Sequence, residues 1–311
     1  MTWLARHRRE VSVALVYAMI LIVLAILAPR FYRGEQLRAI LVANAPILVA
    51  AAGMTMVILC RQIDISIGSQ FCVCGVAAGL LAKAGLPMPG VALATVGIGA
   101  SLGAINGLFV AVAGLPSIVV TLAFLVIWRE SLRYLREGAF VRGLPSDFQW
   151  FGLGGTIGPW AVVAVAFVVF IMFAWALRYL SAGRALYATG SDPEAARLAG
   201  IRPRRVVLGA FTMMGALSGL AALLNSVRFA TVDPNAGLGM EMQVIAAVVV
   251  GGTAISGGRG SLIGVGIGVA MLGTVGPALI FLGVQPQWER AIQGLIILLA
   301  VASDALDRGG R

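Results

Sequence analysis

The chain has 311 residues, of which 60% are hydrophobic and only 12% are charged, and its mean hydropathy is +0.97. Several apolar runs reach the roughly 20 residues needed to cross the hydrocarbon core of a bilayer. This composition excludes an ordinary soluble domain. No linker marks a second domain, so we predict one all-α polytopic membrane domain over residues 1–311.

The net charge of +10 raises the question of a nucleic-acid partner. The arginines, however, stand in clusters between apolar runs, and no basic face is interleaved with stacking aromatics, so we expect no nucleic-acid binding. The preference for basic residues on the cytoplasmic side of a membrane explains the excess better. The three cysteines, Cys60, Cys72 and Cys74, lie in apolar sequence without a nearby histidine. They are therefore expected to be buried thiols, with no metal site or disulfide.

Apolar segments predict about ten transmembrane helices. They lie near residues 11–28, 39–60, 63–82, 88–113, 115–135, 160–178, 206–226, 241–256, 261–280 and 289–303. The first follows Arg6, His7, Arg8 and Arg9 and lacks a small-x-small cleavage site, so it is expected to be a retained span behind a basic cytoplasmic tail, 1–10.

Two of these segments are expected to be short or broken helices. Segment 63–82 opens with the polar residues Asp64 and Ser66, and segment 241–256 ends in glycine. Interrupted segments are tolerated in a membrane only where the backbone is buried in protein or lines a cavity. The stretch Gly251–Gly260 is interpreted as the turn of a broken helix. Ile63–Ser69 and Thr253–Ser261 both end in Gly-Ser, which hints at an internal repeat.

Ten crossings with a cytoplasmic N-terminus place both termini and residues 179–205 in the cytoplasm. This connection and its edges are rich in arginine, as expected on that side of the membrane. The same arrangement places Arg129, Arg133, Arg136 and Arg142 outside, against the rule. The predicted topology is therefore weakest over 129–159.

Residues 190–201 carry the signals of a short polar helix. Asp192 suits the N-cap, Pro193 the first helical position and Glu194 the positive helix end, while Gly200 closes the segment. A helix of about two turns is marginal in water, so another surface must hold it. Its small apolar face is suited to docking on another protein.

The sequence contains no motif for ATP hydrolysis, and this limits how transport could be driven. The only lysine is Lys83, and its context does not fit a P-loop, so ATP-driven action needs a separate ATPase. A secondary transporter is expected to carry ionisable groups within its spans, where Asp64 and Glu241 are the candidates. The only histidine is His7, and neither HExxH nor GxSxG occurs, so we expect no intramembrane enzyme.

Residues 190–201 resemble the cytoplasmic EAA loop of ABC importer permeases, with Glu194, Ala195, Ala196 and Gly200 at the motif positions. Two further stretches, Gly53–Ser69 and Ala246–Gly264, resemble the ribose-type sugar permease branch. The similarity runs from about residue 40 to residue 304. Many sugar permeases have Gly-Gly before Ile-Asp-Leu-Ser; here Arg61 and Gln62 stand there, as in rhamnose importer permeases and close to autoinducer-2 importer permeases.

The resemblance implies a permease that moves a monosaccharide, rhamnose or a similar sugar, across the bacterial inner membrane. A periplasmic sugar-binding protein would deliver the solute, and a second permease chain would complete the path. A cytoplasmic ABC ATPase pair would carry ATP and Mg, and this chain would bind no cofactor or metal. The implied coupling residues are Asp192, Glu194, Ala195, Ala196, Arg197, Leu198 and Gly200.

The residues along the solute path are harder to predict. A buried carboxylate is costly in a membrane, so we expect Asp64 to form an ion pair with Arg61 near the cytoplasmic boundary, with a direct sugar contact as the alternative. Polar residues within spans are either ligands or hydrogen-bonding contacts between helices. The candidates for the path or its gate are Asp64, Ser66, Asn106, Asn225 and Gln243.

Overall fold

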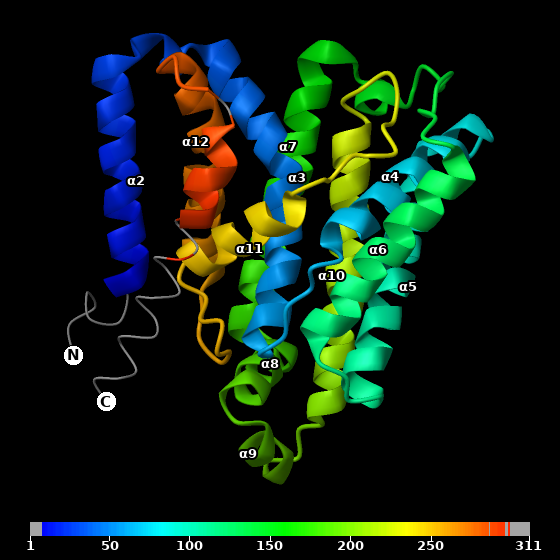
Figure 1. The fold of residues 1–311 in the computed structure, drawn as a ribbon, viewed down its shortest axis with the longest axis vertical. Helices are drawn as coiled ribbons and strands as arrows, with labels where there is room; N and C mark the ends of the chain where they lie inside the picture. The colour runs from blue at the N-terminus through cyan, green and yellow to red at the C-terminus, as the bar shows by residue number, and fades with distance from the viewer. Residues whose placement is uncertain (1–7, 286, 296–297, 299–311) are drawn as a thin grey trace.

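The computed structural model describes residues 8–285, 287–295 and 298, and it shows a bundle of helices (Figure 1). The helices are α2 (Arg8–Leu27), α3 (Gly34–Leu59), α4 (Ile67–Lys83), α5 (Met88–Gly107), α6 (Ser117–Arg136), α7 (Gly154–Tyr179), α8 (Ser181–Ser191), α9 (Pro193–Leu198), α10 (Pro203–Ser226), α11 (Met240–Val250) and α12 (Leu262–Phe281). Short 3-10 turns occur at Pro29–Tyr32 and Gln149–Gly152, and a π-helical turn, Leu108–Val112, extends α5. Within the described part the β structure is a single bridge, Val141 to Val232.

Five helices in the described part of the chain are long and apolar enough to cross a membrane: α3, α5 with its π-helical end, α7, α10 and α12. The all-helical membrane architecture is therefore confirmed. Each of the first nine predicted segments overlaps a helix, whereas segment 289–303 lies partly outside the described residues. The count of ten crossings and the internal repeat stay predictions.

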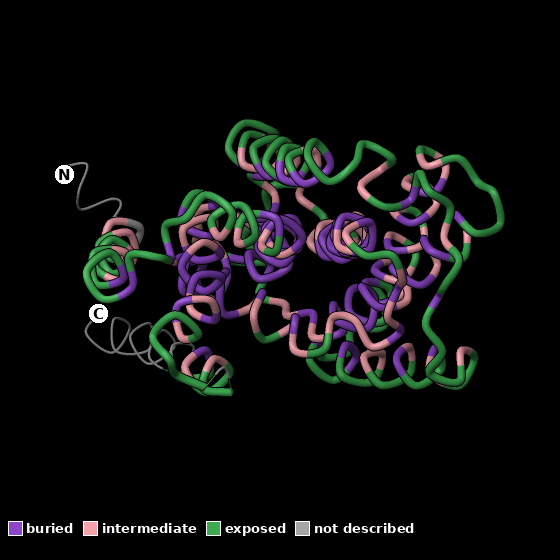
Figure 2. The backbone as a smooth tube through the Cα atoms, turned by 90° about the horizontal axis from the view of Figure 1, so that it is seen from above, coloured by how far each residue is buried: buried purple, intermediate pink, exposed green. Residues whose placement is uncertain are grey.

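Buried residues gather at the centre of the bundle, and its outer faces are exposed (Figure 2). The outer faces of α2 and α7 are apolar, with Ile26 exposed to 73% and Val168 to 65%. Exposed apolar side chains on long helices are suited to lipid rather than to water. Within the bundle α10 packs closely against α5 because glycines line both helices, as in small-residue contacts between membrane helices.

The helices α4 and α11 are too short to span the membrane alone. At 1.5 Å per residue they are about 26 Å and about 16 Å long, against a hydrocarbon core of about 30 Å. Each follows a non-helical connection, 60–66 or 227–239, that runs back along the bundle before the helix begins (Figure 1). The predicted interruptions are confirmed, as is the turn between α11 and α12.

The partly buried connection 60–66 is bonded through two of its backbone N–H groups to side chains of α6. Ile63 donates its N–H to Ser117 Oγ at 3.3 Å, and Ile65 donates to Thr121 Oγ1 at 3.1 Å. Ser117 and Thr121 are four residues apart and therefore share one face of α6. These bonds supply partners for two backbone N–H groups that no helix satisfies, as a membrane interior requires.

Candidate coupling and translocation sites

The helix α9 forms where the sequence predicts it and is capped as expected. The Asp192 carboxylate accepts hydrogen bonds from the N–H groups of Glu194 at 2.9 Å and Ala195 at 3.1 Å. Pro193 occupies the first turn, and Gly200 follows the helix with a φ of +82° that favours glycine. Local signals alone thus define both ends of this element.

The surface of α9 is available to a partner. Ala196 is buried against the rest of the chain, whereas Leu198 is 88% exposed and Glu194, Ala195 and Arg197 are also exposed. In Figure 1 this helix lies at the far end of the molecule, beyond the ends of α8 and α10. A protruding helix with an exposed leucine beside charged groups is suited to protein docking.

Arg61 joins the segment before α9 to the end of α3. Its Nε donates to Gly190 O at 2.5 Å, and its Nη2 donates to Ser191 O. Gly190 and Ser191 end α8, where exposed carbonyls favour a cation. In the same place Gly258, in the turn between α11 and α12, donates its N–H to Leu59 O at 3.0 Å. We call this contact of α3, α8 and the α11–α12 turn the joint.

The joint leaves no room for side chains in place of its glycines. A Cβ at Gly190 would clash with Leu59 O, and one at Gly258 would lie 2.7 Å from the backbone of Ser191. The three segments therefore touch backbone to backbone. Such tight packing transmits displacement because packed interiors have low compressibility.

The predicted ion pair between Asp64 and Arg61 is wrong, because both side chains bind other partners. Asp64 is fully buried and accepts hydrogen bonds from Ser66 N at 2.9 Å, Ser66 Oγ at 2.6 Å and Gln70 Nε2 at 2.9 Å. Arg61 and Asp64 lie in a non-helical connection. In such a connection three residues can span up to about 10 Å, whereas in a helix they would lie within one turn of each other. The connection therefore carries Asp64 away from the end of α3 into the protein interior.

The structure brings Asp64, Ser66 and Asn106 together and adds Gln70, which the sequence analysis missed. Asn106 on α5 donates through Nδ2 to Ser66 Oγ at 2.8 Å and lies 3.4 Å from both Asp64 oxygens. Ser66 and Gln70 are four residues apart at the start of α4, and this spacing was the signal for Gln70. Neutral donors alone surround this carboxylate among the described residues.

The other two predicted path residues lie elsewhere. Asn225, near the end of α10, accepts through Oδ1 from Arg228 Nη1 at 3.2 Å. Gln243 is half-buried on α11. The five candidates thus do not form one site.

Thr121 of α6, another polar residue within a span, accepts a hydrogen bond from Ile65 N in the connection before α4 and therefore acts as a contact between helices.

Sequence similarity to known proteins extends over nearly the whole chain. Residues 36–301 match the family described as branched-chain amino acid transport system / permease component. The chain is 32% identical to the autoinducer 2 import system permease protein LsrC of Escherichia coli O157:H7, over 96% of this chain and 87% of the relative. It is 30% identical to the ribose import permease protein RbsC of Escherichia coli strain K12, over 97% and 94%. No solved structure matches it.

The match over most of the chain agrees with the long apolar helices and the exposed α9. The family description names amino acids, whereas these relatives are named for ribose and autoinducer 2. The shared property is the permease role and not the solute. The chain belongs to this permease family and is a non-catalytic membrane subunit of the ABC importer type.

Proposed function

We propose that this chain is the inner-membrane permease of an ATP-driven importer for a small, neutral, polyhydroxylated solute. Rhamnose, ribose and autoinducer 2 represent that class. The observation that carries the ATP-driven role is α9: a capped, protruding helix that directly follows the end of α8, which Arg61 bonds to the end of α3. The full-length similarity to ribose and autoinducer 2 permeases supports the solute class.

In this mechanism a cytoplasmic ATPase pair binds α9 of two permease chains, identical or related. ATP and Mg reside on the ATPases, and a periplasmic binding protein delivers the solute. Closure of the ATPases displaces α9, and the joint passes the displacement to α3 and to the turn before α12. Two rigid groups of helices then rock between outward-open and inward-open states.

The orientation that this mechanism requires places α9 and both termini in the cytoplasm. Arg8, the first described residue, begins α2 at the end of the bundle where α9 lies (Figure 1). The arginines at 178–205 lie at this end too. This distribution supports the orientation because cytoplasmic segments are enriched in basic residues.

Arg61 and Gln62, which suggested rhamnose, do not identify the solute. The Arg61 side chain binds the end of α8, so this departure from Gly-Gly lies at the joint. Rhamnose and autoinducer 2 are therefore equally supported. The choice needs a transport assay.

The first experiment reconstitutes the chain in liposomes with its ATPase and binding protein, using labelled rhamnose, ribose, autoinducer 2 and leucine. We expect uptake of one hydroxylated solute that requires both ATP and the ATPase. Asp192→Ala should lower this uptake several-fold, because loss of an N-cap costs about 1 kcal/mol of helix stability. Asp192→Asn is the matched control, since asparagine also caps and should retain uptake.

An ion-coupled secondary transporter is the second candidate, favoured by the fully buried Asp64 carboxylate. It predicts gradient-driven uptake in liposomes that contain no ATPase. Such uptake would refute the ATP-driven mechanism. Leucine uptake that requires the ATPase would preserve the mechanism and refute the solute class.

A further inference from the structure

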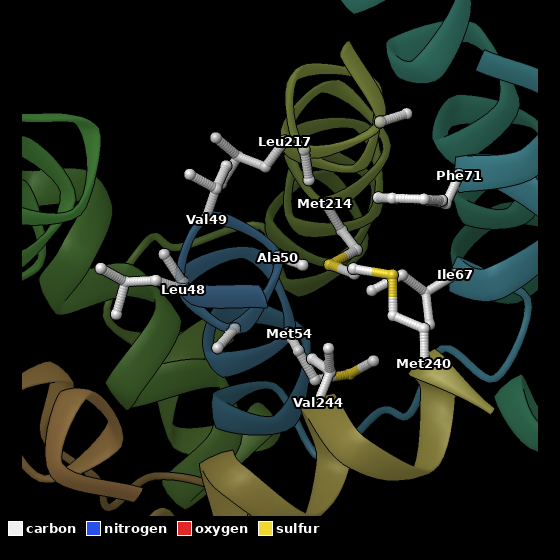
Figure 3. Packing of buried hydrophobic residues seen from close by; sticks show 14 of the residues in the cluster. Leu48, Val49, Ala50, Met54, Ile67, Phe71, Met214, Leu217, Met240 and Val244 are labelled. Atoms are coloured by element: carbon white, nitrogen blue, oxygen red, sulfur yellow. The ribbon is translucent and has the colours of Figure 1, made fainter. Parts of the chain in front are cut away.

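The N-terminal ends of α4 and α11 meet inside the bundle. Ile67 at the start of α4 and Met240 at the start of α11 lie close together beside Met214 of α10 (Figure 3). A Cβ added at Gly68 would lie 2.6 Å from Gly237 O, in the connection before α11. The two interrupted helices therefore direct the positive ends of their dipoles toward one interior region.

Two charged side chains, one from α6 and one from the start of α11, reach this region. A Cβ at Gly68 would clash with Glu241 Oε2 of α11 and would lie 3.2 Å from Arg129 Nη2 of α6. Arg129 is only 5% exposed, and its Nη1 has no hydrogen-bond partner among the described residues. Within the same part of the chain Glu241 Oε2 is likewise buried and unpartnered. Glycine at position 68 lets the backbone of α4 pass close to both side chains, where a larger residue would clash.

Arg129 and Glu241 do not form a salt bridge with each other within the described structure. Burying a charged group without a partner is costly, and ionisable groups inside membrane proteins characteristically line solute pathways. Here the two opposite charges both lie next to a glycine where two interrupted helices begin. Nη1 of Arg129 and Oε2 of Glu241 each have hydrogen-bonding capacity that a bound molecule could use.

We propose that Arg129 and Glu241 form a solute-contact site of the translocation path, for a neutral molecule with adjacent hydroxyl groups. The Glu241 carboxylate would accept hydrogen bonds from hydroxyls, and the Arg129 guanidinium would donate to hydroxyl or ring oxygens. The opposite charges balance, so a neutral solute completes the site without adding charge. This proposal rests on the proposed function and specifies where that solute binds.

The site is distinct from the Asp64 cluster. Ser66 and Gln70 place that cluster on one side of α4, whereas Gly68, two residues along the helix from Ser66, faces Arg129 and Glu241. The Asp64 cluster has several internal hydrogen bonds and holds the start of α4 in place. The Arg129–Glu241 site has free donors and acceptors.

The test measures the concentration dependence of ATP-driven uptake for the labelled solute that the wild-type complex accepts. Arg129→Gln and Glu241→Gln should each raise the KM by about tenfold or more, as expected for loss of a hydrogen bond to a charged group. Gly68→Ala should also raise the KM because its methyl group enters the site. Glu130→Gln is the matched control, because Glu130 is a neighbour of Arg129 but is exposed and paired with Arg133.

A charge-exchanged double variant, Arg129→Glu with Glu241→Arg, separates binding from structure. If the two opposite charges only balance each other within the fold, the exchange should restore both the amount of assembled complex and the wild-type KM. The solute site predicts that the KM stays raised even where the complex assembles. The proposal is overturned if the single variants lower only the maximal rate or the amount of complex, or if the exchange restores the KM.

Failure of this inference is distinguishable from failure of the proposed function. If the wild-type complex shows no ATPase-dependent uptake of any of the labelled solutes, the importer assignment itself fails and this site falls with it. If the wild type transports a hydroxylated solute and the variants keep the wild-type KM, only the site is refuted. Leucine uptake by the wild type would refute the proposal that the site binds a hydroxylated solute, whereas the assignment as an importer would stand.

Discussion

At the residue scale, Arg61 shows how a side chain can take a role that its neighbours in sequence do not suggest. Its backbone has a φ of +62°, which is costly for a residue other than glycine by about 1–3 kcal/mol. Its guanidinium is bonded to the two carbonyls that end α8. Proximity to Asp64 suggested an ion pair, but the partner was supplied by a segment about 130 residues further along the chain.

We expect Arg61→Ala to uncouple ATP hydrolysis from transport. Without the guanidinium, α8 is less tightly bound to α3, and uptake per ATP hydrolysed should fall about tenfold, on the scale of a lost charged hydrogen bond. The measurement is simultaneous uptake and phosphate release in liposomes. Arg202→Ala, at an exposed arginine before α10, should retain coupling. Full coupling in Arg61→Ala would contradict a mechanical role for the joint.

At the element scale, glycine decides which helices approach closely. Gly99 and Gly103 on α5 face Gly215 and Phe211 on α10, and an added Cβ at either α5 position would clash with a carbonyl oxygen of α10. Close approach of this kind replaces the hydrophobic effect as a source of helix association in lipid. The α5–α10 contact thus forms a rigid part of the fold beside the Asp64 cluster, whose Asn106 comes from α5.

We expect Gly103→Val to destabilise the bundle, whereas Gly97→Val on the same helix should be tolerated. Gly97 has open space where its Cβ would be. Overpacking costs typically about 1–3 kcal/mol, so the melting temperature of the purified protein should fall by about 2–8 °C for Gly103→Val. The measurement is thermal unfolding in detergent. Equal melting temperatures for the two variants would contradict the close α5–α10 contact.

At the scale of the whole molecule, α9 and the start of α2 share one end, and the connections before α4 and α11 run back into the bundle (Figure 1). The two interrupted helices can meet only because their backbones are buried by neighbouring helices. The proposed solute contact is therefore in the interior, while the surface for the ATPase is at the cytoplasmic end.

Labelling of single cysteines tests this orientation. Leu198→Cys should react with a membrane-impermeant maleimide in inside-out vesicles and remain unlabelled in right-side-out vesicles. Leu153→Cys, at an exposed position before α7, should show the opposite pattern. The native cysteines are at most 3% exposed, so the unaltered chain should give little background. Labelling of Leu198→Cys from the periplasmic side would refute the coupling role of α9.

The sequence by itself determined the membrane class, the interruptions near Asp64 and Gly251, and the capped helix α9. These features follow from local properties: hydropathy over a span, polar residues within it, and an N-cap with its neighbouring proline and glycine. Only the tertiary structure decided that Arg61 binds α8, that Asn106 completes the Asp64 cluster, and that Arg129 and Glu241 both lie next to Gly68. Each of those outcomes depends on where a non-helical connection directs the chain, and no local pattern of residues specifies that direction.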